Sequence, residues 1–236
     1  MNAYRTSPFA SIPPVVKNLL IINVIFFIAT LAFESKGISL IDLLGVHYFD
    51  SPKFRIWQVI TYMFMHGGFA HIAFNMFALF TFGSTLEYTM GSKRFLNFYL
   101  ITGLGALALQ MLVQAMEVHQ IAGSFTIDVS RFTSTNEAHI RTLSSIYFGP
   151  MVGASGAIFG LLIAFGVLYP DVELLILFIP IPIKAKYIIP AYVVLELVLG
   201  IAQFSGDSIA HFAHLGGALF GFILIKIWQL RRISNF

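Results

Sequence analysis

Four polar side chains stand in stretches of sequence that are otherwise strongly apolar. His71 and Asn75 are four residues apart in one stretch, Ser155 lies in a second, and His214 lies in a third. A serine hydroxyl is a potential nucleophile, and a histidine beside it can accept the hydroxyl proton and later protonate a leaving amine near neutral pH. His71, Asn75 and the backbone N–H of Ser155 are donors that can stabilise a tetrahedral oxyanion. These residue types are the ones that peptide-bond hydrolysis by serine requires.

Each of these residues also has a purely structural interpretation. A serine among small residues often lies at a close helix contact, with its hydroxyl bonded to a backbone carbonyl. A single histidine in a helix is more often a hydrogen-bonded interior residue than a catalyst, and we keep that interpretation for His66 and His211. The four residues together are harder to explain in this way, because polar groups inside a bilayer are costly and usually mark function or a helix contact.

Glycines accompany both of the candidate reacting residues. Gly153 and Gly156 flank Ser155, and Gly217 and Gly221 lie one and two turns after His214. Small residues at such spacings most often serve close helix packing. We therefore expect the helices that carry Ser155 and His214 to approach closely enough for a hydrogen bond between the two side chains.

Two further residues bear on the orientation of His214. Phe159 lies one turn after Ser155 on the same helix face, so we expect its ring to pack against the imidazole. No carboxylate has a suitable place in the sequence to orient His214, and the prediction is a Ser155–His214 dyad. Glu196 lies near the middle of another apolar stretch, where an ionised carboxylate facing lipid is disfavoured. We expect it to face the bundle or a polar cavity, or to be protonated. Its role is either a structural hydrogen bond or a contact that holds its helix against the helix of His71.

The composition indicates a membrane protein. Only 11% of the 236 residues are charged, against about 25% in soluble domains, and the mean hydropathy is +0.84. The absence of cysteine excludes disulfides, thiolate metal sites and cysteine nucleophiles. The net charge of +3 does not call for a nucleic-acid partner, because basic residues gather at cytoplasmic helix ends in membrane proteins.

Six segments are apolar enough, or nearly so, to span a bilayer, which needs about 20 residues each. In chain order they are Val15–Phe33, a helix within Ile56–Leu86, Phe95–Met116, a helix within Thr142–Pro170, Lys186–Phe204 and Ser208–Ile225. The run Leu174–Ile183 is too short and too rich in proline to span, and we expect a connector near the interface or a re-entrant segment. The prediction is an all-α polytopic membrane protein: a six-helix membrane domain over residues 15–230, with short tails at 1–14 and 231–236.

Charge sets the expected orientation. With the N-terminus in the cytoplasm, nine of the 14 Lys and Arg residues fall inside and five outside, which satisfies the positive-inside rule. Both termini are then cytoplasmic, and we predict the cytoplasmic membrane of a bacterium. Ser155 and His214 each lie a turn or two below the outer end of their helices. One water-accessible cavity opening outward would hold both of them with His71 and Asn75.

These motifs resemble the rhomboid family of intramembrane serine proteases, over about Trp57 to Gly221. The matching patterns are Gly153-Ala154-Ser155-Gly156, His71-x-x-x-Asn75 preceded by His66, His214 with Gly217 and Gly221, and Gly83-x-x-x-Glu87-x-x-x-Gly91-Ser92. The resemblance implies a six-helix bundle with the nucleophile on the fourth helix, the base on the sixth and oxyanion support from the second. It implies cleavage in or beside transmembrane segments of membrane-protein substrates within the lipid bilayer, without a cofactor or metal. It leaves the oligomeric state open.

The sequence departs from the family at two positions. Gln58 follows Trp57 where the family often has arginine, so the anchoring of the first outer loop is in question. Phe159 stands where some members have a tyrosine stacked on the catalytic histidine. Neither change removes a reacting group.

Other functions remain open from the sequence. An inactive rhomboid-like protein would bind membrane clients without cutting them, although such relatives typically lose the serine or the histidine. A transporter could use His71, His214 and Glu196 as a proton path, but it would not require Ser155. A zinc intramembrane protease would need His-Glu-x-x-His, which this chain lacks.

Overall fold

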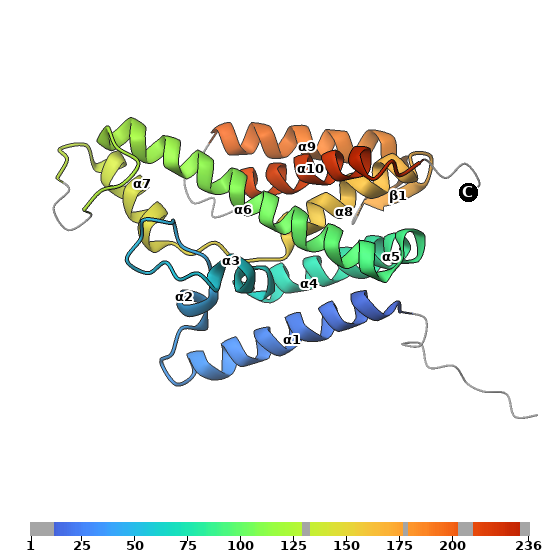
Figure 1. Ribbon diagram of the computed structural model, residues 1–236, viewed down its shortest axis with the longest axis horizontal. Helices are drawn as coiled ribbons and strands as arrows, with labels where there is room; N and C mark the ends of the chain where they lie inside the picture. The colour runs from blue at the N-terminus through green and yellow to red at the C-terminus, as the bar shows by residue number, and fades with distance from the viewer. Residues whose placement is uncertain (1–11, 129–132, 177–178, 203–209, 232–236) are drawn as a thin grey trace, which may run out of the picture.

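The computed structural model describes residues 12–128, 133–176, 179–202 and 210–231, and these residues are mostly helical (Figure 1). The helices of more than one turn are α1 (Pro14–Glu34), α2 (Leu40–Leu44), α4 (Phe69–Ala78), α5 (Ser84–Met90), α6 (Ser92–Ala122), α7 (Glu137–Phe148), α8 (Ser155–Leu168), α9 (Ala185–Ala202) and α10 (His211–Ile227). Shorter helical segments are α3 (Gln58–Thr61), the 3-10 turn η2 (Tyr62–Phe64) and the π-helical turn η3 (Leu79–Gly83), which joins α4 to α5. The predicted all-α membrane fold is confirmed.

Within the described residues, four helices are long and apolar enough to cross a membrane. They are α1, the continuous helix Phe69–Met90, α6 and α9. The other two apolar helices are shorter, with 14 residues in α8 and 17 in α10. The chain is therefore a multi-pass membrane protein, while helix length by itself does not establish the predicted count of six spans.

Two of the predicted runs are broken in the structure. The run Ile56–Leu86 is interrupted at residues 65–68, between η2 and α4. The run Thr142–Pro170 is interrupted at residues 149–154, between α7 and α8. Glycine begins or ends both breaks, and the second also contains Pro150, which cannot donate an amide to a helix. The uncharged composition of each run was compatible with one long helix, but the glycines and Pro150 interrupt the helical backbone there.

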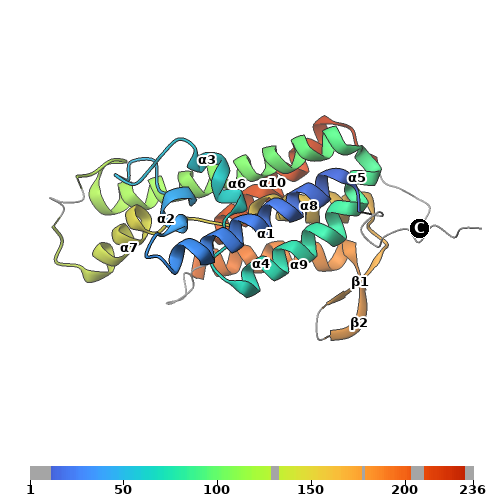
Figure 2. The same ribbon diagram turned by 90° about the horizontal axis from the view of Figure 1, so that it is seen from below.

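The connector between α8 and α9 is a β-hairpin, which was not predicted. Strands β1 (Glu173–Ile176) and β2 (Ile179–Lys184) pair antiparallel, with Glu173 opposite Lys184 and Leu174 opposite Ile183. The hairpin projects from one end of the helices (Figure 2). At that end α1 also begins and α10 ends (Figure 1). The predicted cytoplasmic tails lie mostly outside the described residues.

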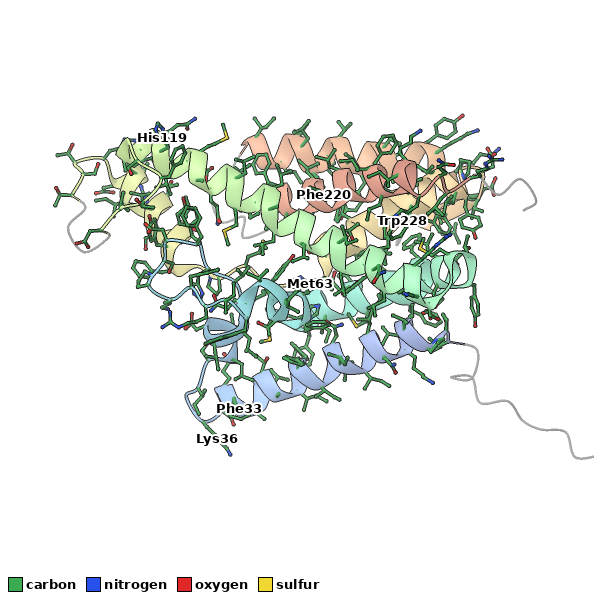
Figure 3. The ribbon with its side chains drawn as sticks, viewed as in Figure 1. Phe33, Lys36, Met63, His119, Phe220 and Trp228 are labelled. Atoms are coloured by element: carbon green, nitrogen blue, oxygen red, sulfur yellow. The ribbon has the colours of Figure 1, made fainter. Side chains whose placement is uncertain are left out.

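Two glycines of α6 leave room for side chains of the neighbouring segments. A Cβ added to Gly103 would come within 2.2 Å of the Met63 side chain, and one added to Gly105 would come within 2.2 Å of the Phe220 ring. Both side chains are labelled in Figure 3, and Phe220 belongs to α10. Because glycine leaves room for a side chain from the neighbouring segment, α10 packs closely on α6 as well as on α8.

A buried carboxylate fixes the start of α1. Glu87, 2% exposed, accepts hydrogen bonds from the backbone amides of Val15 and Val16 at 3.0 and 2.8 Å. The hydroxyl of Ser92 also donates to Glu87, at 2.7 Å. The first amides of a helix lack intrahelical partners and carry partial positive charge, so an anion stabilises them. This contact gives a structural reason for the glutamate in the Gly-x-x-x-Glu pattern.

Candidate active site

Ser155 and His214 meet at the contact between α8 and α10. The Oγ of Ser155 lies 2.8 Å from the Nε2 of His214, within hydrogen-bond distance. His214 lies one turn into α10 and is 8% exposed. Ser155 is the first residue of α8, and so lies at the end of its helix and not a turn or two below it as predicted. The break at residues 149–154 accounts for the difference.

The segment before Ser155 is held by backbone hydrogen bonds. Met151 pairs with Val46 in both directions, at 2.8 and 2.9 Å, and the amide of Gly153 donates to the carbonyl of Tyr62 at 2.9 Å. Gly153 has a φ of +128°, which residues with a Cβ rarely adopt. An added Cβ there would also lie 2.8 Å from the Nε2 of His71. Glycine therefore allows the turn into α8 and the close approach of His71.

A carboxylate stands behind His214, contrary to the prediction of a dyad without one. Glu196 of α9 is 3% exposed, and its Oε2 lies 2.9 Å from the Nδ1 of His214. The same oxygen lies 2.7 Å from the Nδ1 of His211. Glu196 thus faces the bundle, as expected, but its partners are on α10. Sequence reasoning missed this contact because nothing in α9 shows which of its apolar faces turns toward α10.

Glu196, His211 and His214 are also the set of residues best placed to hold a metal among those that the structure describes. One ligand atom from each lies within 4.8 Å of the others. The separations of 2.7 and 2.9 Å are those of hydrogen bonds between imidazole N–H groups and a carboxylate. A hydrogen-bonded cluster therefore accounts for these residues without a metal.

Phe159 packs flat against the imidazole of His214. The ring centroids are 4.3 Å apart and the planes differ by 9°. Phe159 also contacts the ring of Tyr192 on α9, with centroids 5.0 Å apart. The imidazole is therefore restrained on one face by Phe159 and at Nδ1 by Glu196.

His71 and Asn75 lie on α4, one turn apart. The amide of Gly67 lies 3.4 Å from the Nδ1 of His71, so this nitrogen is the acceptor and Nε2 carries the proton. Nε2 is the atom that approaches Gly153. Asn75 is 6% exposed, and its amide nitrogen has no hydrogen-bond partner among the described residues. A buried donor without a partner is costly, and it is available to a ligand that carries negative charge.

His66 supports His71 from the break before α4. The two rings meet edge to face, with centroids 5.0 Å apart. His66 is 1% exposed, and neither ring nitrogen has a hydrogen-bond partner within the described ranges. Its contact in this structure is packing against His71.

Gln58 anchors the segment between α1 and α3, predicted to face outward, at a position where the family often has arginine. It is fully buried, and its Oε1 accepts hydrogen bonds from the backbone amides of Arg55 and His47 at 3.0 and 3.4 Å. Its Nε2 donates to the carbonyls of Lys53 and Leu43 at 3.1 and 3.3 Å. A neutral amide can hold the loop because the groups it binds are backbone donors and acceptors. The side chain of Arg55 does not take over this role and bonds to carbonyls at the surface.

The fold and the site together define a helical membrane protein in which a serine and a histidine side chain lie within hydrogen-bond distance. Comparison with known proteins identifies the family of this protein. The family model described as Rhomboid domain matches residues 53–229. The chain therefore belongs to the rhomboid family, whose members are intramembrane proteases.

The relatives found among curated proteins carry mitochondrial names. The chain is 31% identical over 198 residues to "Presenilin-associated rhomboid-like protein A, mitochondrial" of Danio rerio, covering 79% of this chain and 43% of the relative. It is 30% identical over 164 residues to "Rhomboid protein 1, mitochondrial" of Saccharomyces cerevisiae, covering 70% and 39%. The chain thus spans less than half the length of these two relatives. Their names do not fit the predicted bacterial membrane.

Proposed function

We propose that this chain is an intramembrane serine endopeptidase in which Ser155 is the nucleophile and His214 the general base. The observation that carries the proposal is the 2.8 Å contact between Ser155 Oγ and His214 Nε2 inside a rhomboid-family membrane fold. The hydroxyl donates its proton to Nε2 as Oγ attacks the substrate carbonyl carbon. His214 then gives that proton to the leaving amine, and water hydrolyses the resulting acyl-enzyme by the same steps.

The oxyanion formed in this reaction needs donors. His71 Nε2 and the amide nitrogen of Asn75 are proposed for this role, together with the backbone N–H of Ser155 at the N-terminus of α8. The first amides of a helix have no intrahelical partner and favour negative charge. Donors fixed before the reaction cost no reorganisation when the charge develops.

The proposed substrates are membrane proteins that present a transmembrane segment to the site. Rhomboid-family membership supports this substrate class. For the orientation, we propose that the end where α1 begins and α10 ends lies on the inner side of the membrane, because more of the Lys and Arg residues fall on that side than on the other. The mitochondrial names of the relatives give no support to a bacterial membrane. The proposed orientation applies in a bacterial membrane and in a mitochondrial one.

Reconstitution tests the proposal. Purified protein in liposomes is mixed with single-span substrates, and the products are identified by mass spectrometry. We expect cleavage in or beside the transmembrane segment by the wild type and none by Ser155→Ala, with equal melting temperatures in detergent. A fluorophosphonate probe should label the wild type at Ser155. Full cleavage by Ser155→Ala would refute the nucleophile, and binding of substrates without cleavage by the wild type would indicate an inactive client-binding protein.

A further inference from the structure

One oxygen of Glu196 contacts both histidines of α10. We propose that Glu196, kept ionised by His211, fixes the tautomer of His214, so that Ser155, His214 and Glu196 act as a triad in which Glu196 is a positioning residue. This inference rests on the function proposed above. It starts from two separations, 2.9 Å to His214 and 2.7 Å to His211, both made by Oε2 to Nδ1 atoms.

The protonation state of the Glu196 carboxyl group determines which ring nitrogen of His214 carries the proton. An ionised carboxylate only accepts hydrogen bonds, so each imidazole that contacts it at Nδ1 must carry its proton there. A neutral His214 with its proton on Nδ1 has a free lone pair on Nε2. That lone pair faces the Ser155 hydroxyl at 2.8 Å. The carboxylate therefore selects the only neutral tautomer of His214 that can act as a base toward Ser155.

His211 matters because Glu196 is buried. With 3% exposure, an ionised carboxylate needs several donors to offset its desolvation. His211 supplies one at 2.7 Å, and His214 supplies another at 2.9 Å. If Glu196 took up a proton, its O–H could turn toward the Nδ1 of His214. The imidazole proton would then move to Nε2, and the base would be lost.

The proton transfers balance without protonation of Glu196. Ser155 loses its hydroxyl proton to His214 Nε2 as the new C–O bond forms, and the imidazole becomes a cation. Its Nδ1–H remains shared with Glu196 Oε2, and the negative charge there stabilises the cation. The proton on Nε2 then passes to the leaving amine. The carboxylate begins and ends the cycle ionised.

Other titratable groups face this cluster and must be considered in a pH experiment. On α9 the neighbour is Tyr192, and on α4 the neighbour is His71, which interacts electrostatically with His214. His66 packs on His71 from the break before α4. From α8, Ser155 and the apolar ring of Phe159 face His214. Each remains unchanged in the variants below.

The experiment compares three test substitutions and one control substitution with the wild type in the full chain. Glu196→Gln keeps the shape of the side chain and removes its charge. His211→Leu removes the second donor, whereas His211→Asn retains an N–H near the position of Nδ1. Glu87→Gln is the matched control, because Glu87 is the other deeply buried carboxylate of the described residues and accepts hydrogen bonds from the start of α1 and from Ser92. The measurements are kcat/KM for a membrane substrate against pH, the rate of fluorophosphonate labelling of Ser155, and the melting temperature.

We expect Glu196→Gln to lower both kcat/KM and the labelling rate by roughly 10²-fold, because the base loses its orienting anion. The acidic limb of the pH profile should move to lower pH, since the imidazolium is no longer stabilised. His211→Leu should move that limb in the opposite direction, because Glu196 then takes up a proton more readily. His211→Asn should recover most of the loss. Glu87→Gln should lower the melting temperature and leave the labelling rate and the pH limb unchanged.

The outcomes separate this inference from the proposed function. In one outcome the wild type is labelled and cleaves substrate, and Glu196→Gln and His211→Leu equal it in labelling rate and in the acidic limb of the pH profile. That outcome would overturn the role of Glu196 and leave the protease assignment standing. A wild type that neither labels nor cleaves would overturn the protease assignment itself. If Glu196→Gln fails to fold, the comparison of His211→Leu with His211→Asn decides: equal pH limbs in those two variants refute the inference.

Discussion

Gly217 of α10 and Gly156 of α8 lie in backbone contact: a Cβ built on Gly217 would stand 1.8 Å from the carbonyl oxygen of Gly156. One turn before Gly217 on its helix is His214, and next to Gly156 is Ser155. The separation of the two helices at this level is therefore set by the absence of a side chain. The same contact places the serine hydroxyl and the imidazole within hydrogen-bond distance.

Gly217→Ala should therefore separate the reacting pair. The obstructing atom belongs to the backbone, so no rotation of a side chain relieves the clash and the helices must move apart. Overpacking of this kind costs about 1–3 kcal/mol, and a displacement of about 1 Å at a reacting pair costs roughly 10²-fold in rate. We expect a lower melting temperature and a loss of fluorophosphonate labelling. The control is Gly68→Ala, where an added Cβ meets nothing within 4 Å. Equal labelling in the two variants would contradict the argument.

His71→Ala and Asn75→Ala should each lower kcat more than they change KM. Donors that meet charge only in the transition state affect the chemical step, and removal of one costs about 10²–10³-fold. Asn75 has a buried amide nitrogen without a described partner, so its removal should cost little stability. Steady-state kinetics on a membrane substrate with melting temperatures measures both effects. A change confined to KM in Asn75→Ala would assign that residue to substrate positioning.

Parts of the fold follow from the sequence because lipid imposes a simple constraint. Predominantly apolar runs of sufficient length form α1 and α6, and the predicted Val15–Phe33 agrees closely with Pro14–Glu34. Helix α6 extends beyond the predicted Met116 to Ala122. The hairpin after α8 was missed, since its alternating prolines and aliphatic residues carry no strong turn signal.

The contact of Glu196 with His214 could not be predicted for a physical reason. In a soluble helix, the apolar stripe shows which face is buried. In a membrane helix, the buried and lipid-facing sides are both apolar, so periodicity does not fix the rotation of α9. A buried glutamate in α9 did indicate an inward face, but it did not identify the helix it would meet. Ser155 and His214 were identified as a pair because their glycine neighbours mark the contact directly.

The stability of the segment between α1 and α3 should fall in acid through His47. The side chain is fully buried, and burial lowers its pKa below the ordinary value of 6.5. Between the lowered pKa and 6.5 the unfolded chain binds a proton that the folded chain does not. The stability from neutral His47 is thus fully present above about pH 6.5 and is lost as the pH falls through the folded pKa. Thermal melts from pH 7.5 to pH 5 should show a steeper fall in the wild type than in His47→Leu. Parallel curves would contradict this account.

The last prediction concerns the ring that stacks on His214. Phe159 lies parallel to the imidazole, with centroids 4.3 Å apart. Stacked aromatic pairs contribute about 0.5–1.5 kcal/mol beyond their buried area. If that energy restrains the base, its loss should lower the rate about 2- to 10-fold, since 1.4 kcal/mol corresponds to a factor of 10. Phe159→Leu keeps an apolar side chain without the ring plane, and we expect kcat/KM and fluorophosphonate labelling to fall together by that factor.

Phe159→Tyr is the matched comparison, because it keeps the ring and adds the hydroxyl found in some members of the family. Phe159 is 4% exposed and contacts Tyr192, so the added hydroxyl needs a partner in a crowded place. We therefore expect activity close to the wild type with a lower melting temperature. If Phe159→Leu labels as fast as Phe159→Tyr, the stack does not orient His214, and the hydrogen bond from Nδ1 to Glu196 is sufficient to hold the imidazole toward Ser155.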